Sequence, residues 1–257
     1  MTPHNMKYTI RKILPRKVGA LLSRSIYVYE VFTYMVGIGK YQRRVTCTLC
    51  GNTGTFYAVG HPPRYNAMCP VCNSLERHRL IALLNDREKL FANKSVLHFA
   101  PEQSVKALIK RECQYYLSAD LDVRQADIAL NIEKIDLPDH TWDVVVASHI
   151  LEHVNDMLAL KEIFRILRPN GFLLAMVPII EGWEKTYEDE SINTPALREL
   201  HFSQCDHIRF YGRDFLTRLS ESGFSVRTFT ASGDESVKFG LLRGEKIFIC
   251  NKPPATR

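Results

Sequence analysis

The stretch "VLHFAPEQS" (Val96–Ser104) decides how the second half of the chain is interpreted. It begins as a short apolar run typical of a buried strand, and "APEQS" has the composition of a turn that leads into a helix. A strand, turn and helix of this kind open the cofactor-binding half of many α/β domains. This turn, however, lacks the glycines that usually let the backbone approach a bound cofactor. Its interpretation therefore depends on the sequence around it.

Short apolar segments alternate downstream with amphipathic patterns of helical period. The expected strands are 95–100, 115–121, 142–149, 171–179, 224–230 and 246–251. Helices are expected near 105–113 and 155–167, and another at 73–91, with Asn73 as its N-cap and Glu76 three residues on. This alternation predicts an α/β fold with a mostly parallel sheet covered on both faces. Ligands bind such sheets at the carboxyl ends of the strands.

Two cysteine pairs precede the α/β region. Cys47 and Cys50 form one C-x2-C pair, and Cys69 and Cys72 form another, with 18 residues between them. This spacing is typical of a four-cysteine zinc ribbon, in which four thiolates close the coordination sphere of a structural ion. Two disulfides or free core thiols are the alternatives, and a cytoplasmic location disfavours the disulfides. The remaining cysteines are expected to be ordinary buried residues: Cys113, Cys205 and Cys250.

The 257-residue chain is 46% hydrophobic and 24% charged, enough for one main domain and a small module. Residues 1–44 hold nine lysines and arginines against one acidic residue, interleaved with apolar and aromatic side chains. This basic amphipathic segment is expected to contact an anionic membrane surface or a phosphate backbone, or to pack on the core with a solvated basic face. No apolar run is long enough for a membrane span and no signal peptide is recognisable, so we expect a cytoplasmic protein.

Two further motifs are "LEHV" (Leu151–Val154) and "LRPNG" (Leu167–Gly171), the second expected to form a turn into the next strand. On these residues the chain resembles the class I S-adenosylmethionine-dependent methyltransferases, and most closely the subgroup that carries "LEHV" and an "L-K/R-P-G-G" turn. The resemblance covers 95–252 and implies a Rossmann-like methyltransferase fold. The ribbon and its linking helix then occupy 45–94, and a polar, aromatic-rich insertion at about 181–214 is expected to bind the acceptor.

The resemblance implies where S-adenosylmethionine binds. The family's D-x-G-x-G turn falls on "HFAPE", and Glu102 is expected to face the ammonium or a ribose hydroxyl of the cofactor. Asp120, 20 residues beyond Ala100, has the position of an acid that accepts from ribose hydroxyls. Asn131 matches the residue that accepts from adenine, although it could also be a plain turn residue. The full expected set is His98, Phe99, Ala100, Glu102, Asp120, Leu121, Asn131, Ile132, Ser148 and His149.

Candidate catalytic residues cluster in two places. "SHILEHV" puts His149, Glu152 and His153 on one expected helix face. In a ubiquinone-pathway methyltransferase branch that the chain resembles, this face binds a divalent metal, but His149 replaces a glutamate there, so a metal is left open. The second place is "DHIRFY" in the insertion, which offers a base, a cationic clamp and a phenol, or an ion pair that merely braces the loop. With His207 as the preferred base, the expected set is His207, Asp206, Arg209, Tyr211 and His153.

Three functions fit this sequence. The first is a methyltransferase that acts on an oxygen of a small molecule or glycan, with an acceptor hydroxyl deprotonated by a side chain. The second is an RNA methyltransferase gripping phosphates with the ribbon and the basic segment, which the non-basic remainder of the chain disfavours. The third is a non-catalytic scaffold that binds zinc and cofactor, or a degenerate domain that binds nothing.

Overall fold

The computed structural model describes residues 28–29, 32, 44–60 and 63–254. The basic amphipathic segment expected at 1–44 therefore lies almost entirely outside the described residues, and its contacts stay a prediction. Within the described part of the chain, no helix is both long and apolar enough to cross a membrane.

A seven-stranded sheet forms the centre of the fold, in the order β12-β13-β9-β8-β5-β6-β7. Only β13 runs antiparallel to its two neighbours, and the other pairs are parallel. The strands are β5 Ser95–Phe99, β6 Tyr115–Asp120, β7 Ile128–Ala129, β8 Trp142–Ser148, β9 Leu167–Met176, β12 Ser225–Phe229 and β13 Ile247–Asn251. All six predicted strands are present, and the short β7 is an addition. The predicted Rossmann-like α/β fold is confirmed, with strand order reversing between β5 and β8.

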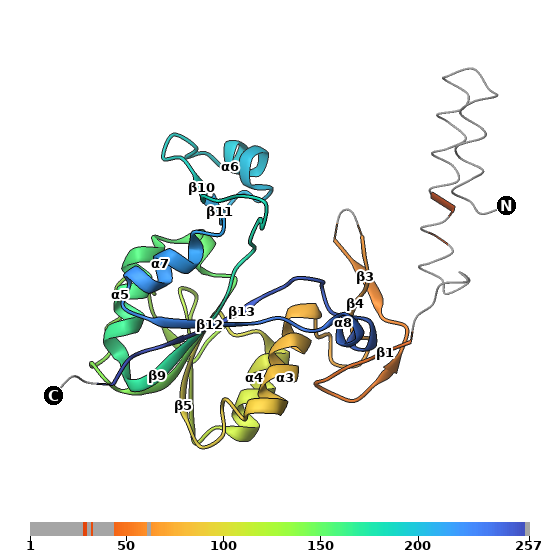
Figure 1. Cartoon of the computed structure of the whole chain (residues 1–257), viewed down its shortest axis with the longest axis horizontal. Helices are drawn as coiled ribbons and strands as arrows, with labels where there is room; N and C mark the ends of the chain where they lie inside the picture. Colours follow the sequence, from red (N-terminus) through yellow and green to blue (C-terminus); the bar gives the residue numbers. More distant parts are fainter. Residues whose placement is uncertain (1–27, 30–31, 33–43, 61–62, 255–257) are drawn as a thin grey trace.

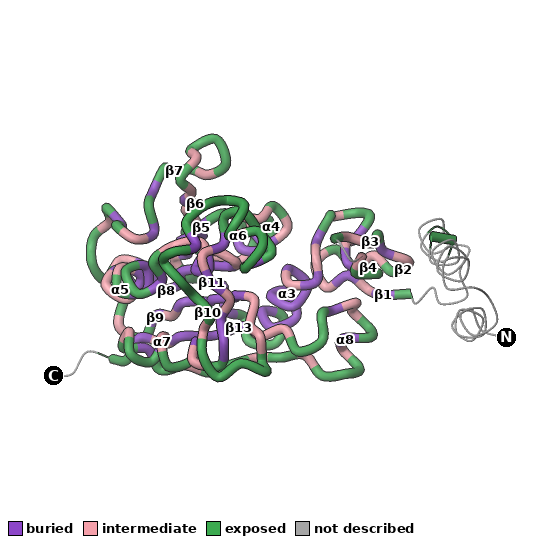
Figure 2. Tube along the Cα trace, turned by 90° about the horizontal axis from the view of Figure 1, so that it is seen from above, coloured by how far each residue is buried: buried purple, intermediate pink, exposed green. Residues whose placement is uncertain are grey.

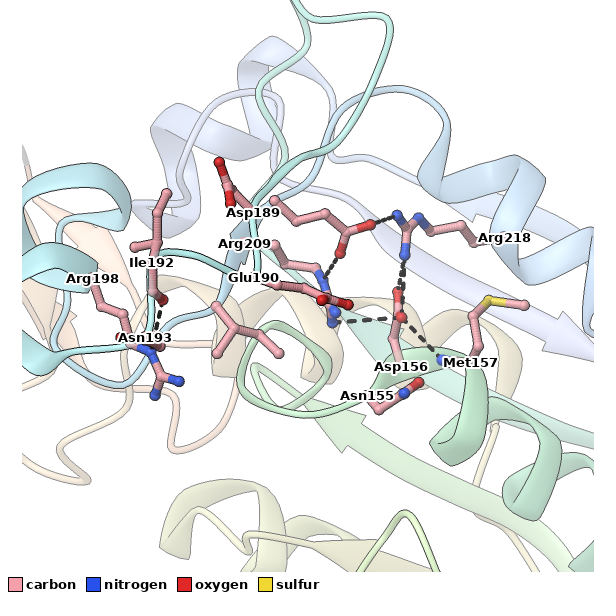
Figure 3. Close-up of a pocket in the computed structure, with 12 residues that line it drawn as sticks. Asn155, Asp156, Met157, Asp189, Glu190, Ile192, Asn193, Arg198, Arg209 and Arg218 are labelled. Atoms are coloured by element: carbon pink, nitrogen blue, oxygen red, sulfur yellow. Dashed lines mark hydrogen bonds and ion pairs between the residues drawn. The ribbon is translucent and has the colours of Figure 1, made fainter.

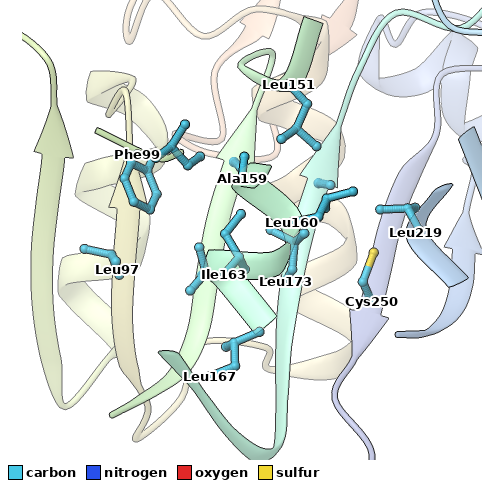
Figure 4. Packing of buried hydrophobic residues seen from close by; sticks show 14 of the residues in the cluster. Leu97, Phe99, Leu151, Ala159, Leu160, Ile163, Leu167, Leu173, Leu219 and Cys250 are labelled. Atoms are coloured by element: carbon cyan, nitrogen blue, oxygen red, sulfur yellow. The ribbon is translucent and has the colours of Figure 1, made fainter. Parts of the chain in front are cut away.

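Helices cover both faces of the sheet (Figure 1). On one face, α5 (Asp156–Ile166) and α7 (Phe215–Glu221) pack on alternate residues of the central strands, as the contacts of Leu97, Leu160 and Leu173 show in Figure 4. On the other face, α3 (Glu76–Glu88) and α4 (Gln103–Glu112) pack on the intervening residues. Burial is concentrated in the central strands and in α3 (Figure 2). The central strands are covered on both faces and therefore read as continuous apolar runs, which explains why they could be predicted.

The segment "LRPNG" is not a turn before the next strand, as the sequence suggested. It forms the start of β9, where the pairing with β8 shifts register between Trp142 and Val144. Asn170 takes a left-handed backbone, with φ at 66°. At Gly171, a Cβ would lie 2.9 Å from the carbonyl oxygens of Arg168 and Asp143, so only glycine fits this close approach. The two residues therefore build an irregular strand pairing.

The N-terminal module consists of two short hairpins, β1 Val45–Thr46 with β2 Thr53–Gly54 and β3 Tyr57–Val59 with β4 Arg64–Met68. The following helix α3 has Leu75 as its N-cap, not Asn73. Asn73 instead has a left-handed backbone and donates its N–H to the carbonyl of Cys69 at 3.0 Å. Asn73 therefore belongs to the cysteine knuckle and not to the helix that the sequence predicted.

Two segments stand outside the sheet. The insertion contains β10 (Tyr187–Glu188), α6 (Pro195–Phe202) and β11 (Arg209–Phe210), and it projects from the body of the domain (Figure 1). Between β12 and β13, α8 (Gly233–Phe239) packs against β1 of the N-terminal module. A short 3-10 turn, η1 (Leu151–His153), precedes α5.

The three unpaired cysteines differ in burial. Cys250 is buried in the core, as expected, and Cys113 is partly buried. Cys205 is exposed, so the expectation that it is buried was wrong. It lies in the insertion just after α6, where no second layer covers the chain.

Candidate active site

The turn after β5 keeps a left-handed backbone although it has no glycine. Ala100 has φ at 43°, in the region that glycine adopts most easily, and its N–H donates to the carbonyl of Ala119 at 2.9 Å. The side chains of His98 and Phe99 point into the protein layers, at 0% and 3% exposure. Burial lowers the pKa of His98 to about 4, which keeps it neutral. The backbone of this turn, more than its side chains, is what faces the strand ends.

Glu102 follows this turn as the N-cap of α4 and joins it to α3. Its Oε1 accepts from Arg77 Nε at 2.7 Å and from His78 Nε2 at 2.8 Å. Burial opposes ionisation of Glu102, but the bonds from His78 and Arg77 outweigh it and lower its pKa to about 2. The second oxygen, Oε2, is buried and has no hydrogen-bond partner among the described residues. An ionised oxygen in that state can accept from a ligand.

The residues expected around ribose and adenine lie at the ends of β6 and β7. Asp120 ends β6, and its Oδ1 accepts from the backbone of Asp122 at 2.9 Å. Leu121, next to it, is 76% exposed. Asn131 is exposed, and its side-chain oxygen accepts from the N–H of Glu133 at 2.9 Å, as in a plain turn, while Ile132 is buried. The structure thus brings Asp120 and Leu121 to the expected edge and gives Asn131 a turn contact.

A cavity of about 350 Å³, here called the strand-end pocket, opens at the carboxyl ends of β8 and β9. Four parts of the chain line it: the N-terminal module with α3, the strand ends, the insertion and the loop before β13. Its lining residues include Arg64, Glu76, Arg77, His149, Pro178, Phe202, His207, Phe210, Leu242 and Glu245. The size lies within the range of small-molecule sites. His149 and His207 are the two predicted site residues that it unites.

A carboxylate and three histidines gather at one end of this pocket. The His149 Nδ1 lies 3.2 Å from Oε1 of Glu152, which is fully buried. The rings of His153 and His207 meet edge to face at 4.6 Å. Ligand atoms of Glu152, His153 and His207 lie within 4.8 Å of one another and could hold a metal. The prediction that His149, Glu152 and His153 share one helix face is wrong, because His149 lies before η1 and His153 is its last residue. In the candidate metal group, His207 takes the place of His149.

The imidazole of His207 is buried at 4% exposure. Its Nδ1 has no partner within the described structure, so no hydrogen bond fixes its tautomer. Burial, followed by the charge of His153, lowers the pKa of His207. Asp206, the residue expected to orient it, contacts His153 instead, with Oδ2 at 3.4 Å from Nδ1. His207 is therefore a neutral imidazole at neutral pH.

Arg209 and Tyr211 brace the insertion and do not line the strand-end pocket. Arg209 donates to the carbonyls of Leu151 and Val154, and Tyr211 donates to Leu151 at 2.9 Å. Figure 3 shows Arg209 and Arg218 converging on Asp156, beside a separate cavity of about 550 Å³ lined by the start of α5, by Arg218 of α7 and by the insertion. Tyr211 is fully buried, and burial raises its pKa. These contacts agree with the alternative that an ion pair braces the insertion. The acids that pair with Arg209 are Asp156 and Glu188, and not Asp206.

The four cysteines of the N-terminal module converge. Their sulfurs all lie within 4.8 Å of one another, with Cys47 to Cys72 at 3.6 Å and Cys50 to Cys69 at 3.7 Å. A tetrahedral zinc with bonds of about 2.3 Å requires sulfur separations of about 3.8 Å. The Ser74 hydroxyl lies 3.3 Å from the Cys47 sulfur. The donor set and its spacing fit a structural zinc ion.

Arg79 ties this module to the α/β domain. It is fully buried, and its guanidinium donates to carbonyls on both sides of the interface. The acceptors are Asn66, Ala67 and Ser74 near the cysteines, and Phe239 and Gly240 at the end of α8. Such a buried cation is stabilised only by a complete set of acceptors. The module and the loop before β13 are therefore held in one arrangement.

Sequence reasoning missed the contributions of Arg64, Arg77 and Glu245 to the pocket. Arg64 comes from the N-terminal module and pairs with Glu76 at 2.9 Å. Glu245 lies in the loop after α8. Nothing in the sequence indicates that the ribbon and the C-terminal loop reach the same cavity.

Comparison with known proteins agrees with this architecture. Residues 89–175 match the family described as a methyltransferase domain. The ubiquinone/menaquinone biosynthesis C-methyltransferase UbiE of Escherichia coli O1:K1 is 33% identical over 118 residues, 44% of this chain and 46% of that protein. The protein of the same name from Vibrio cholerae is 28% identical over 116 residues, 40% of this chain and 45% of that one. The chain spans less than half the length of these curated relatives.

A solved structure shares the fold at low sequence identity. The [4+2]-cyclase SpnF aligns with a TM-score of 0.52 and 14% identity over 69% of this chain and 82% of that one. That likeness concerns the fold alone. The sheet order gives the chain a Rossmann-like α/β fold, and residues 89–175 of it are similar to the methyltransferase-domain family.

Proposed function

We propose that the protein transfers a methyl group from S-adenosylmethionine to a hydroxyl of a small molecule or glycan bound in the strand-end pocket. The observation that carries this proposal is the set of buried polar atoms at the strand ends that lack partners in the described structure: Ser148 Oγ, His149 Nε2, Glu102 Oε2 and His207 Nδ1. Buried polar groups are almost always hydrogen-bonded, so unpaired ones beside a pocket indicate where ligands complete them.

Residues of this chain fit the cofactor in three places. The backbone at Ala100 allows close approach, and Glu102 Oε2 can accept from an ammonium or hydroxyl group. Asp120 can accept from ribose hydroxyls, and the exposed Leu121 offers adenine an apolar face. Ser148 ends β8 and His149 follows it, and we assign both to the methionine end of the cofactor. When bound, the cofactor supplies a methyl group that its positive sulfur already activates for displacement.

The protein must then align the acceptor and remove its proton. The His207 imidazole takes the hydroxyl proton as the new carbon–oxygen bond forms and the methyl–sulfur bond breaks. A lowered pKa suits this role, because the ring stays unprotonated at and below neutral pH. Phe202 and Phe210 from the insertion wall the pocket beside it. His153 remains the alternative base, since its ring contacts that of His207.

A zinc ion in the cysteine cluster is the second part of this proposal. Four thiolates with no open position would make it structural. Cys47 and Cys69 are buried together with Val45 and Phe56, so the ion would complete the small core of this module.

An RNA acceptor is disfavoured by the charges of the pocket. Both of its arginines are already paired, Arg64 with Glu76 and Arg77 with Glu102. A phosphate backbone would have to displace those carboxylates. A scaffold without catalysis is separated from an enzyme by a methyl-release assay on protein that binds S-adenosylhomocysteine.

Asp120→Ala is expected to weaken S-adenosylhomocysteine binding by about 1 to 3 kcal/mol, the cost of leaving ribose hydroxyls unpaired. Titration calorimetry measures it. Asp122→Ala is the matched control, because Arg124 already occupies both oxygens of Asp122. Equal affinity of wild type and Asp120→Ala, with a loss in Asp122→Ala, would move the ribose contact to Asp122. No binding by the wild type would remove the cofactor proposal.

A further inference from the structure

Glu245 is a carboxylate in the strand-end pocket that the proposed reaction does not use. It lies between α8 and β13, and its Oε2 is buried without a partner among the residues that the structure describes. Burial raises its pKa to about 7. The neighbouring charged groups are His149, Glu76, Arg77 and Arg64. Leaving such an oxygen unpaired is costly, so a ligand is the natural partner.

The arginines of the pocket do not serve Glu245. Arg64 Nε bonds Glu76 at 2.9 Å, and Arg77 Nε bonds Glu102 at 2.7 Å. A carboxylate or phosphate on the acceptor would therefore find no free cation in the pocket, because Glu76 and Glu102 already pair with its two arginines. An anion that enters a partly buried cavity loses its hydration and gains no ion pair in return. The pocket disfavours an anionic acceptor.

The unpaired oxygens of the pocket region favour an acceptor rich in hydrogen-bond donors. Glu102 Oε2, Glu152 Oε2 and Glu245 Oε2 are all buried and unpaired within the described residues. If the first serves the cofactor, Glu152 and Glu245 are left, and of these two only Glu245 lines the pocket. The apolar side chains of Phe202, Phe210 and Leu242 complete the lining. Apolar faces with a few converging acceptors suit a ring that carries several hydroxyl groups.

We propose that Glu245 selects an uncharged, polyhydroxylated acceptor by accepting hydrogen bonds from hydroxyl groups next to the one that is methylated. This inference rests on the proposed function and names the acceptor class of the same pocket. Anionic acceptors are disfavoured because Arg64 and Arg77 are not free to pair with them, and because the ionised form of Glu245 repels them. The N-terminal module thereby contributes to specificity, because Arg64 holds Glu76 in the pocket wall. Glu245 is a specificity residue, and the proton is taken elsewhere.

The test uses the full chain saturated with S-adenosylhomocysteine and three sets of probes: uncharged methyl hexopyranosides, the matching hexuronates and the matching amino sugars. Saturation-transfer NMR and competition give relative affinities. Wild type is expected to prefer the uncharged glycosides to the uronates by at least about tenfold. Glu245→Gln should weaken the preferred glycoside by about three- to tenfold. Glu245→Lys should shift preference toward the uronate.

Glu184→Gln is the matched control, because Glu184 is an exposed residue of the insertion outside the pocket lining, and it should leave selectivity unchanged. Unchanged affinity of each variant for S-adenosylhomocysteine shows that it is folded. Preference of wild type for uronates or amino sugars, or binding of no probe by protein that binds S-adenosylhomocysteine, would overturn the acceptor class. Selectivity unaltered in Glu245→Gln and Glu245→Lys would overturn the role of Glu245. Failure to bind S-adenosylhomocysteine would instead overturn the proposed function.

Discussion

Replacing His207 by alanine is expected to lower kcat by about 10²-fold or more while leaving the affinity for S-adenosylhomocysteine nearly unchanged. General-base catalysis by a positioned side chain contributes a factor of this size. His207 lines the strand-end pocket, whereas the expected cofactor contacts lie at the turn after β5 and the end of β6. Single-turnover methyl release and calorimetry on the same preparations measure the two quantities.

His201→Ala is the matched control. His201 lies in the same insertion, on α6, but it bonds the Tyr187 hydroxyl and is exposed. Its loss should change kcat little. The assignment would be reversed if His153→Ala lost turnover and His207→Ala kept it.

The pH dependence of the same reaction should follow the lowered pKa of His207. A base works only when unprotonated, so kcat should stay level from neutral pH downward and fall only below the ordinary histidine pKa of about 6.5. Burial is the main cause of the shift, and the nearby charge of His153 adds to it. A fall that begins well above pH 7 in the wild type would contradict His207 as the base.

The central strands β5 and β8 were predictable because they are buried on both faces and read as apolar runs, whereas β12 at the edge is largely exposed. Val144 to Ala147, for example, are all fully buried. A pattern of this kind is local, so sequence alone reveals it. The turn after β5 was harder, because its missing glycines suggested a lost cofactor site. Ala100 keeps the left-handed backbone all the same, and alanine is the smallest side chain that can replace glycine there.

The catalytic cluster was predicted less well, for a physical reason. "DHIRFY" is dense in functional groups, but sequence does not show which way each side chain points. His207 lines the strand-end pocket, whereas Arg209 and Tyr211 form hydrogen bonds with backbone carbonyls and with Asp156. Glu245 was overlooked because a glutamate in a polar loop looks like any solvated residue. Its burial depends on contacts with segments far away in the sequence.

Cys69→Ser should reduce the zinc content from one ion per chain to nearly none and lower the thermal midpoint by about 10 °C or more. Loss of a structural metal removes most of the folding energy of such a module, and about 1 kcal/mol corresponds to 2 to 4 °C in a chain of this size. Atomic-emission analysis and calorimetry measure these changes. Cys205→Ser is the matched control, because Cys205 is exposed and outside the cysteine cluster.

The loss should also reach the acceptor side of the pocket. When the module unfolds, Arg79 loses its acceptors at Asn66, Ala67 and Ser74. The guanidinium is then no longer held in position to donate to Phe239 and Gly240. Arg64 and the loop that carries Glu245 then lose their positions, whereas Asp120 at the far side of the sheet keeps its own. Acceptor methylation should therefore fall much more than cofactor affinity. Freshly purified wild type without zinc, or Cys69→Ser that retains it, would show that the four thiols hold no ion.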